Sequence, residues 1–209
     1  MEHKAGYVNI IGNPNVGKST LMNALIGEKL SIITHKAQTT RHRILGILNE
    51  KDYQIVFSDT PGVIDPEYKL QESMMNFVYS AFQDADVLIY MIEVGEKGLK
   101  DQKLFERLKK TEVPVLILLN KIDLSEQDLV SKEMDMWSSI LPSADLLPIS
   151  ALNNFNINVI KRRLVDMLPV CPPYYDKDAI TDKSERFFIE EIIREKILTH
   201  YKKEIPYSV

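Results

Sequence analysis

The sequence has 209 residues, of which 44 % are hydrophobic and 27 % are charged, and its formal net charge is −4. This length suits one domain of ordinary size with a short appendage, and the composition is typical of a globular protein rather than a disordered or fibrous one. The acidic balance argues against a general nucleic-acid binder, so no DNA partner is expected, and the short apolar runs without a signal-peptide core predict a cytoplasmic protein.

Strand-like and helix-like segments alternate along residues 7–168. Strands are predicted at 7–11, 44–48, 53–57, 87–94, 113–119 and 146–149. Helices are predicted at 19–26, 70–82, 99–110 and 126–141, and a last one carries the apolar stripe Ile157, Ile160, Leu164 and Leu168. This order predicts an α/β fold with a mainly parallel sheet covered by helices on both faces. Ligands of such sheets bind beyond the carboxyl ends of the strands, which here follow residues 11, 57, 119 and 149.

Two expectations concern the helices in the second half of the chain. Ser125 is well placed as the N-cap of the helix at 126–141, with Asp128 three residues on. After the proline-rich run at 169–173, which predicts a stiff linker, residues 184–201 again have a helical pattern. That helix places Ile189, Ile193 and Ile197 on one face, and we expect the face to pack on the first domain or inside a second one. Phe188 and Ile192 widen the same face.

A phosphate-binding motif follows the first strand. Residues 12–19, called the phosphate loop below, read GNPNVGKS and match G-x-x-x-x-G-K-[ST]. Glycines let backbone N–H groups turn towards phosphates, Lys18 brings a positive charge to the outer phosphates, and Ser19 offers a hydroxyl to magnesium. The helix N-terminus adds its dipole. The predicted phosphate-site residues are Gly12, Asn13, Pro14, Asn15, Val16, Gly17, Lys18, Ser19 and Thr20.

A second polar motif, Asp59-Thr60-Pro61-Gly62, follows the strand at 53–57. An aspartate at a strand end beside a phosphate loop suits a magnesium site, and Gly62 would let its N–H approach the γ-phosphate. The polar loop at 31–43, called the switch loop below, supplies a threonine hydroxyl for the same cation. Thr40 is favoured over Thr39, although spacing alone leaves both open. The predicted magnesium ligands are Ser19, Thr40 and Asp59, whereas His35 and His42 lack carboxylate partners and do not suggest a metal site.

The base-specificity motif, Asn120-Lys121-Ile122-Asp123, follows the apolar strand at 113–119. The Asp123 carboxylate can accept from both N1–H and the N2 amino group of guanine, whereas adenine would leave it unpaired. Asn120 can bridge the base and the phosphate loop, and the Lys121 stem can lie over the ring. Residues 150–152, called the base loop below, can donate a backbone N–H to guanine O6. The predicted base-site residues are Asn120, Lys121, Asp123, Ser150, Ala151 and Leu152.

Together these motifs predict a GTPase that binds GTP or GDP with Mg²⁺, with Lys18, Asn15, Thr40 and Gly62 as the residues that assist hydrolysis. Val63 stands where a water-orienting glutamine would be needed, so intrinsic turnover should be slow. Arg41 and Arg43 are weaker candidates for phosphate-facing cations or a partner surface. A pure binding switch uses the same residues and stays open, whereas the guanine motif argues against an ATPase or small-molecule kinase.

With the stretch KAQTTRHRI at 36–44, these motifs resemble the Era family of bacterial GTPases. The likeness continues through PISA at 148–151, and the segments 180–187, 191–197 and 204–209 are similar to the opening of that family's C-terminal KH domain. The resemblance implies a P-loop NTPase with a Ras-like G domain at 1–168, a linker at 169–180 and an incomplete KH-like domain at 181–209. A KH domain clamps RNA with a G-x-x-G loop, and no glycine follows residue 180, so a truncated chain is expected.

The resemblance also implies partners and a helper ion. It implies a role in assembly of the small ribosomal subunit, with the rRNA 3′ end held by the KH part, and peripheral association with the inner face of the cell membrane. It further suggests that Asn15 coordinates a K⁺ ion that takes the place of an arginine finger. The alternative within GTPases is a factor for tRNA modification or large-subunit assembly.

Overall fold

The fold is built on a six-stranded sheet within the part of the chain that the computed structural model describes, residues 2–34, 36 and 39–201. The strand order is β2-β3-β1-β4-β5-β6, and only β2 runs antiparallel to its neighbour. The strands are β1 (Lys4–Ile11), β2 (Ile44–Asn49), β3 (Tyr53–Asp59), β4 (Val87–Glu93), β5 (Val115–Asn120) and β6 (Asp145–Pro148). The mainly parallel α/β sheet predicted from the sequence is confirmed.

The strand register brings the polar motifs to one edge of the sheet. Ile10 of β1 lies opposite Asp59 of β3, and Asn120 of β5 lies opposite Glu93 of β4. Leu119 in turn pairs with Pro148 at the end of β6. The carboxyl ends of β1, β3, β5 and β6 therefore lie at the same edge of the sheet, and segments distant in sequence meet there.

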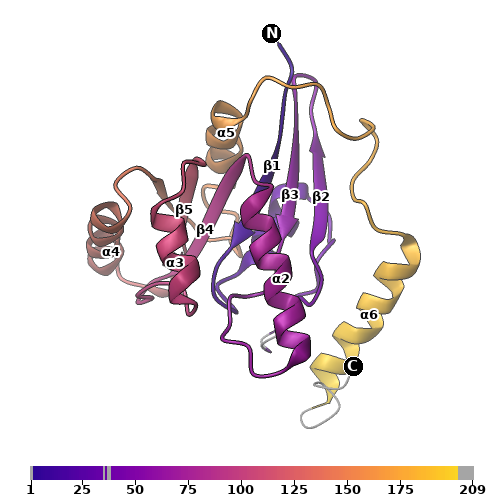
Figure 1. The fold of residues 1–209 in the computed structure, drawn as a ribbon, viewed down its shortest axis with the longest axis horizontal. Coiled ribbons are helices and arrows are strands. Elements are labelled where there is room, and N and C mark those ends of the chain that lie inside the picture. Colours follow the sequence, from indigo (N-terminus) through magenta and orange to yellow (C-terminus); the bar gives the residue numbers. More distant parts are fainter. Residues whose placement is uncertain (1, 35, 37–38, 202–209) are drawn as a thin grey trace.

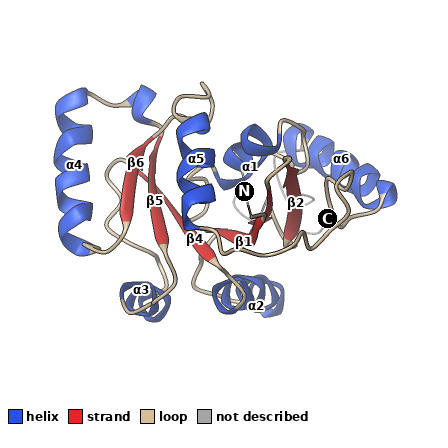
Figure 2. Cartoon of the chain, turned by 90° about the horizontal axis from the view of Figure 1, so that it is seen from above, coloured by secondary structure: helices blue, strands red, loops and turns tan. Residues whose placement is uncertain are grey.

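Helices cover both faces of the sheet (Figures 1 and 2). They are α1 (Lys18–Ile26), α2 (Lys69–Gln83), α3 (Gln102–Lys109), α4 (Gln127–Ile140), α5 (Ile157–Met167) and α6 (Glu185–His200), with a 3₁₀ turn at Ile122–Leu124. One hydrophobic cluster joins α1 and α5 to the sheet, and the predicted stripe of α5 is buried in it. The other joins α2, α3 and α4 to the opposite face and contains the single tryptophan, Trp137, fully buried. Both clusters hold the strands that present the polar edge.

Two predicted helix starts are wrong. The helix expected at 99–110 begins at Gln102, because the Asp101 side chain accepts from Leu104 N–H and caps it, while Leu99 is buried in the preceding loop. The helix expected to be capped by Ser125 begins at Gln127 after Glu126, with no side-chain cap. Ser125 instead ends the 3₁₀ turn, where its N–H donates to the Ile122 carbonyl.

The proline-rich linker lies against the β2 edge and the start of β1 rather than apart from the domain. Gln54 of β3 accepts from the backbone N–H groups of Tyr174 and Tyr175 and donates to the Tyr175 carbonyl. Ile47 N–H donates to the Ile180 carbonyl, and the Thr181 hydroxyl donates to the Leu45 carbonyl. These contacts hold the linker on the sheet up to residue 181, and the Ser184 side chain then caps the start of α6.

Helix α6 packs on the first domain through its polar side rather than through its isoleucines. Ile189, Ile192 and Ile193 are 59 %, 52 % and 55 % exposed, so this apolar face does not pack on the first domain. The other expectation, that the face packs inside a second domain, stays a prediction. Buried instead are Glu191, Arg194, Glu195 and Leu198. The predicted KH strand at 204–209 lies outside the described residues. No helix among those described has both the length and the apolar content needed to cross a membrane.

Candidate nucleotide-binding site

A cavity of about 490 Å³ opens at the carboxyl ends of the strands, between the phosphate loop, the switch loop and the base loop. Thirteen of its lining residues were predicted from the sequence. They are Pro14, Asn15, Gly17, Lys18, Ser19, Thr20, Thr40, Gly62, Asn120, Lys121, Asp123, Ala151 and Leu152. The three sequence motifs and the base loop therefore converge on one hollow.

The phosphate loop wraps the Lys18 ammonium. Lys18 Nζ donates to the carbonyls of Gly12 (3.1 Å) and Asn13 (2.8 Å), and burial lowers its pKa to about 8. Gly17 precedes α1 with φ 103°, a left-handed conformation that favours glycine. A Cβ at Gly17 would lie 2.4 Å from Asn120 Nδ2, so this glycine also makes room for the base-site asparagine. The loop thus presents a buried cation and the start of a helix to one spot, which suits an anion.

Three oxygen-bearing side chains meet beneath the phosphate loop. The Ser19 hydroxyl donates to Asp59 Oδ2 at 2.7 Å, and the Thr40 hydroxyl lies 3.0 Å from it. Asp59 is fully buried, its Oδ1 has no hydrogen-bond partner among the described residues, and burial raises its pKa. A buried acceptor without a donor is costly, and hard oxygen ligands are those Mg²⁺ prefers. The donor set therefore fits a magnesium ion.

The two threonines of the switch loop differ in their partners. The Thr39 hydroxyl donates to the Lys36 carbonyl and lies within hydrogen-bonding distance of Thr34 Oγ1, at 2.6 Å in each case. The Thr40 hydroxyl faces Ser19 instead. This geometry favours Thr40 over Thr39 as the switch-loop ligand.

Asn120 links the two halves of the cavity. Its Nδ2 donates to the Val16 carbonyl of the phosphate loop at 2.7 Å, and its Oδ1 accepts from Ala151 N–H of the base loop at 2.9 Å. The same side chain is buried. One residue therefore determines the spacing between the phosphate end and the base end.

Lys121 and Asp123 lie at the base end. Lys121 adopts the left-handed conformation (φ 63°), and its ammonium forms an ion pair with Glu93 at the end of β4. Asp123 follows in the 3₁₀ turn and is exposed to the cavity, opposite the base loop with its exposed Leu152. A planar base between these two segments would have the carboxylate at its edge.

Several predicted residues lie behind the cavity wall and shape it. The side-chain amide of Asn13 donates to the Glu96 carboxylate and the Gly98 carbonyl, and so holds the loop before α3. The Thr60 hydroxyl donates to the Ile10 carbonyl. Ser150 accepts from Asn153 N–H and turns the base loop. The other predicted residues absent from the lining are Gly12, Val16, Asp59 and Pro61.

The structure shows where three further residues of the sequence analysis lie, namely Val63, Gly62 and Arg43. Val63 is buried in the core, and its N–H donates to the Gly12 carbonyl, so its side chain does not face the cavity. A Cβ on Gly62 would lie 2.7 Å from Pro14 Cα, so only glycine allows this close approach to the phosphate loop. Arg43 bonds Asp84, Asn9 and Ser58 and does not line the cavity, so its candidacy as a phosphate-facing cation is wrong.

Six lining residues were not among the predicted binding residues. They are Ile32, Ile33, Thr34, Lys36, Thr39 and Leu124. Five belong to the switch loop. The polar composition of that loop indicated a functional role, but it did not indicate which of its side chains face the cavity. Leu124 simply extends the base motif by one residue.

Comparison with known proteins extends these observations. A family model described as a 50S ribosome-binding GTPase matches residues 7–121. A Clostridium botulinum protein named GTPase Era is 43 % identical over 99 % of this chain, which spans 70 % of that protein. A chloroplastic ERA-like GTPase from Oryza sativa is 45 % identical, also over 99 % of this chain, which spans half of that relative.

Two solved structures are similar throughout. A structure of Era in complex with MgGDPNP and nucleotides 1506–1542 of 16S ribosomal RNA superposes with a TM-score of 0.92 at 37 % identity, covering 99 % of this chain and 70 % of that one. A variant of Aquifex aeolicus Era bound to GDP·AlF4⁻ gives 0.89 at 37 % identity, covering 98 % and 70 %. The likeness therefore includes the linker and α6 as well as the sheet.

Proposed function

The chain belongs to the Era family of GTPases, and we propose that it binds GTP or GDP with Mg²⁺ in the cavity described above and acts in assembly of the small ribosomal subunit. The observation that carries the proposal is Asn120, which joins the phosphate loop to the base loop across a single cavity. The proposal assigns nucleotide binding to residues 1–168, with 169–180 as linker and RNA contact to the KH-like part that begins at residue 181. This role would place the protein in the cytoplasm.

Each end of the cavity has chemistry for one end of a guanine nucleotide. Lys18 and the N–H groups of the phosphate loop would hold the outer phosphates, and Asp123 would accept from the two donors of guanine. Ser19, Asp59 and Thr40 would hold magnesium, which when bound neutralises charge on the transferred phosphoryl group. Because adenine lacks both donors, the site should reject ATP.

Hydrolysis at this site would rest on positioning and charge rather than on a side-chain base. Val63 is buried, so no side chain at that position orients the attacking water. Lys18 and the phosphate-loop N–H groups remain to stabilise the developing charge, and Gly62 lets its own N–H come close to the outer phosphate. A slow intrinsic rate follows, which also suits the alternative in which the nucleotide mainly sets a conformation.

Potassium is expected to accelerate GTP hydrolysis at least about tenfold over sodium, a small part of what an arginine finger contributes. The supporting observation is that Asn15 lines the cavity, with φ 66°, on the exposed side of the phosphate loop. Phosphate release under single-turnover conditions in KCl and NaCl measures the effect. The variant Asn15→Ala should lose the stimulation and keep the sodium rate. Equal rates of the unchanged protein in the two salts would contradict this role for potassium.

Ribosomal binding is expected to favour the small subunit and the GTP-like state. Co-sedimentation of the chain with purified small or large subunits, in GDPNP or GDP, tests this directly. We expect pelleting with small subunits in GDPNP, less in GDP, and no pelleting in GDPNP by an Asp123→Asn control. The supporting observation is the likeness to Era solved with 16S rRNA.

The alternative, a factor acting on the large subunit, has support in the family model described as 50S ribosome-binding. Pelleting with large subunits alone would favour that alternative. Pelleting with neither subunit would contradict a ribosomal contact by this chain. Both outcomes would leave the nucleotide-binding assignment standing, because competition by GTP and ATP for the cavity tests that separately.

A further inference from the structure

A buried arginine on α6 reaches the switch loop. The Arg194 side chain is 9 % exposed, and its Nη2 donates to the Thr39 carbonyl at 2.6 Å. Its Nε and Nη2 also donate to the two carboxylate oxygens of Glu191, one turn earlier, at 2.8 and 2.6 Å. The Glu191 carboxylate thus neutralises the guanidinium and orients it towards the loop.

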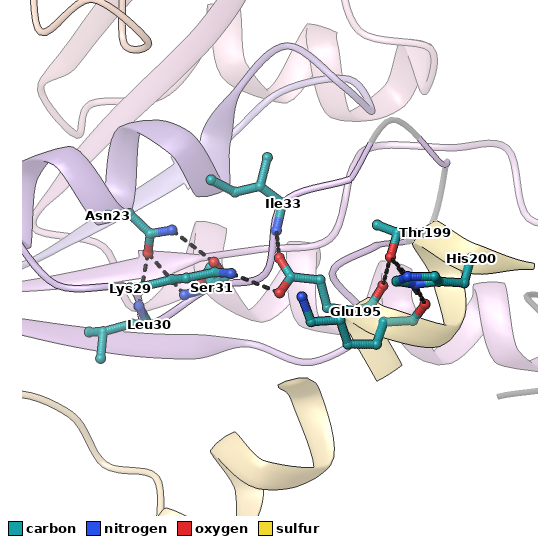
Figure 3. A network of polar contacts seen from close by, with 9 residues as sticks. Asn23, Lys29, Leu30, Ser31, Ile33, Glu195, Thr199 and His200 are labelled. Atoms are coloured by element: carbon teal, nitrogen blue, oxygen red, sulfur yellow. Dashed lines mark hydrogen bonds and ion pairs between the residues drawn. The ribbon is translucent and has the colours of Figure 1, made fainter. Parts of the chain in front are cut away.

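The neighbouring residue of α6 contacts the start of the same loop. Glu195 accepts from Ile33 N–H and pairs with the Lys29 ammonium, 2.7 Å away (Figure 3). On the other side, Asn23 of α1 accepts from the N–H groups of Leu30 and Ser31 and donates to the Ser31 carbonyl. Residues 30–33 are thus held between α1 and α6, and Arg194 contacts the loop again at Thr39.

Apolar burial accounts for only part of this orientation of α6, since Leu198 is buried and Phe187 and Phe188 pack against the cluster that contains α1 and α5. The helix leaves three isoleucines exposed and buries a glutamate–arginine pair instead, and Arg194 Nη1 has no partner within the described residues. A buried ion pair loses hydration and commonly adds little stability, so stability alone gives weak reason for this arrangement. What the pair does achieve is a hydrogen bond to one carbonyl of the switch loop.

That carbonyl belongs to the residue before the proposed magnesium ligand. The peptide bond between Thr39 and Thr40 is planar, so holding the Thr39 carbonyl constrains the backbone from which the Thr40 hydroxyl projects towards Ser19. The shift of a positioned group by about 1 Å costs roughly 100-fold in rate. A contact from outside the sheet can therefore control the geometry of the site.

We propose that Arg194, oriented by Glu191, is a positioning residue for GTP hydrolysis that holds Thr39 so that the Thr40 hydroxyl reaches the magnesium site. The proposal rests on the function proposed above. Thr40 is needed only in the state with a γ-phosphate, so loss of Arg194 weakens the GTP state and spares the GDP state. The helix following the linker thereby takes part in the reaction.

Arg194→Gln is expected to lower the hydrolysis rate at saturating GTP about 10- to 100-fold and to raise several-fold the Mg²⁺ concentration for half-maximal rate. GDP affinity should change less than twofold. The matched control is Arg186→Gln, because Arg186 lies on the same helix, is exposed and pairs with Glu190 on the outer side of α6 rather than with the switch loop. Trp137 fluorescence reports folding of every variant, since that residue is the single tryptophan and is fully buried.

A second variant separates positioning from folding. Glu191→Leu with Arg194→Met fills similar space without a buried charge, a change that commonly preserves or raises stability. We expect it to unfold at or above the temperature of the unchanged protein and to show the same losses in rate and Mg²⁺ dependence. A rate and Mg²⁺ requirement equal to those of Arg186→Gln in either folded variant would overturn the positioning role. Absence of GTP hydrolysis by the unchanged protein would contradict the proposed function instead.

Discussion

Asp123→Asn is expected to lower affinity for GTP and GDP by about 10³- to 10⁴-fold while leaving the fold intact. The carboxylate accepts from two guanine donors, and an amide would offer one acceptor and turn an N–H₂ donor towards the second. Asp123 is exposed to the cavity and lies in a short 3₁₀ turn, so the change removes no core packing. The loss should therefore be confined to recognition of the base.

The same substitution should create a preference for xanthine nucleotides. Xanthine has a carbonyl where guanine has its amino group, and the new N–H₂ can donate to it. Isothermal titration with GDP and XDP measures both affinities, and Asp128→Asn, an exposed residue in the first turn of α4, is the control. Retained GDP affinity, or equal losses for GDP and XDP, would place the base elsewhere.

Lys18→Ala is expected to weaken binding of GTP and GDP by about 2 to 5 kcal/mol, which corresponds to roughly 30- to 4,000-fold. In the buried setting of the phosphate loop, the ammonium is poorly screened by solvent and would face the phosphate oxygens directly. Hydrolysis should fall at least as far as binding, because the transition state carries charge on the same oxygens.

Fluorescent GDP analogues and phosphate release measure the two losses of Lys18→Ala. Lys109→Ala is the control, because Lys109 pairs with Glu106 on the outside of α3. That substitution removes the same charge far from the cavity. Equal losses of nucleotide affinity in Lys18→Ala and Lys109→Ala would indicate an effect of net charge rather than of a phosphate contact. An unchanged affinity in Lys18→Ala would contradict the phosphate assignment.

Much of the site was predictable because each motif is contiguous and follows a strand. The phosphate loop needs only a strand, glycines and a helix start, and all three are encoded within residues 4–26. The order of apolar strands also indicated the parallel sheet, and that sheet places the ends of β1, β3 and β5 at one edge, with β4 between β1 and β5. Local sequence was sufficient because the chemistry is carried by backbone turns and their immediate neighbours.

Helix capping shows where local patterns were insufficient. Ser125 has the composition of an N-cap, yet its N–H completes the 3₁₀ turn of the base motif, and α4 begins two residues later. Asp101 does cap α3, because its side chain accepts from Leu104 N–H. Two adjacent local structures compete at Ser125, and the geometry of the base site decides between them.

The sequence alone was sufficient to predict the fold class, the strand-end motifs and a chemistry for guanine recognition, because these depend on residue type and short spacing. Only the tertiary structure showed Thr40 facing Ser19 while Thr39 bonds within its own loop, turned Arg43 away to Asp84, and added the base loop to the contacts expected of Asn120. It also decided which side of α6 is buried. A helical stripe records which residues are apolar, but the buried side depends on partners more than 150 residues away, such as the carbonyl that Arg194 meets at Thr39.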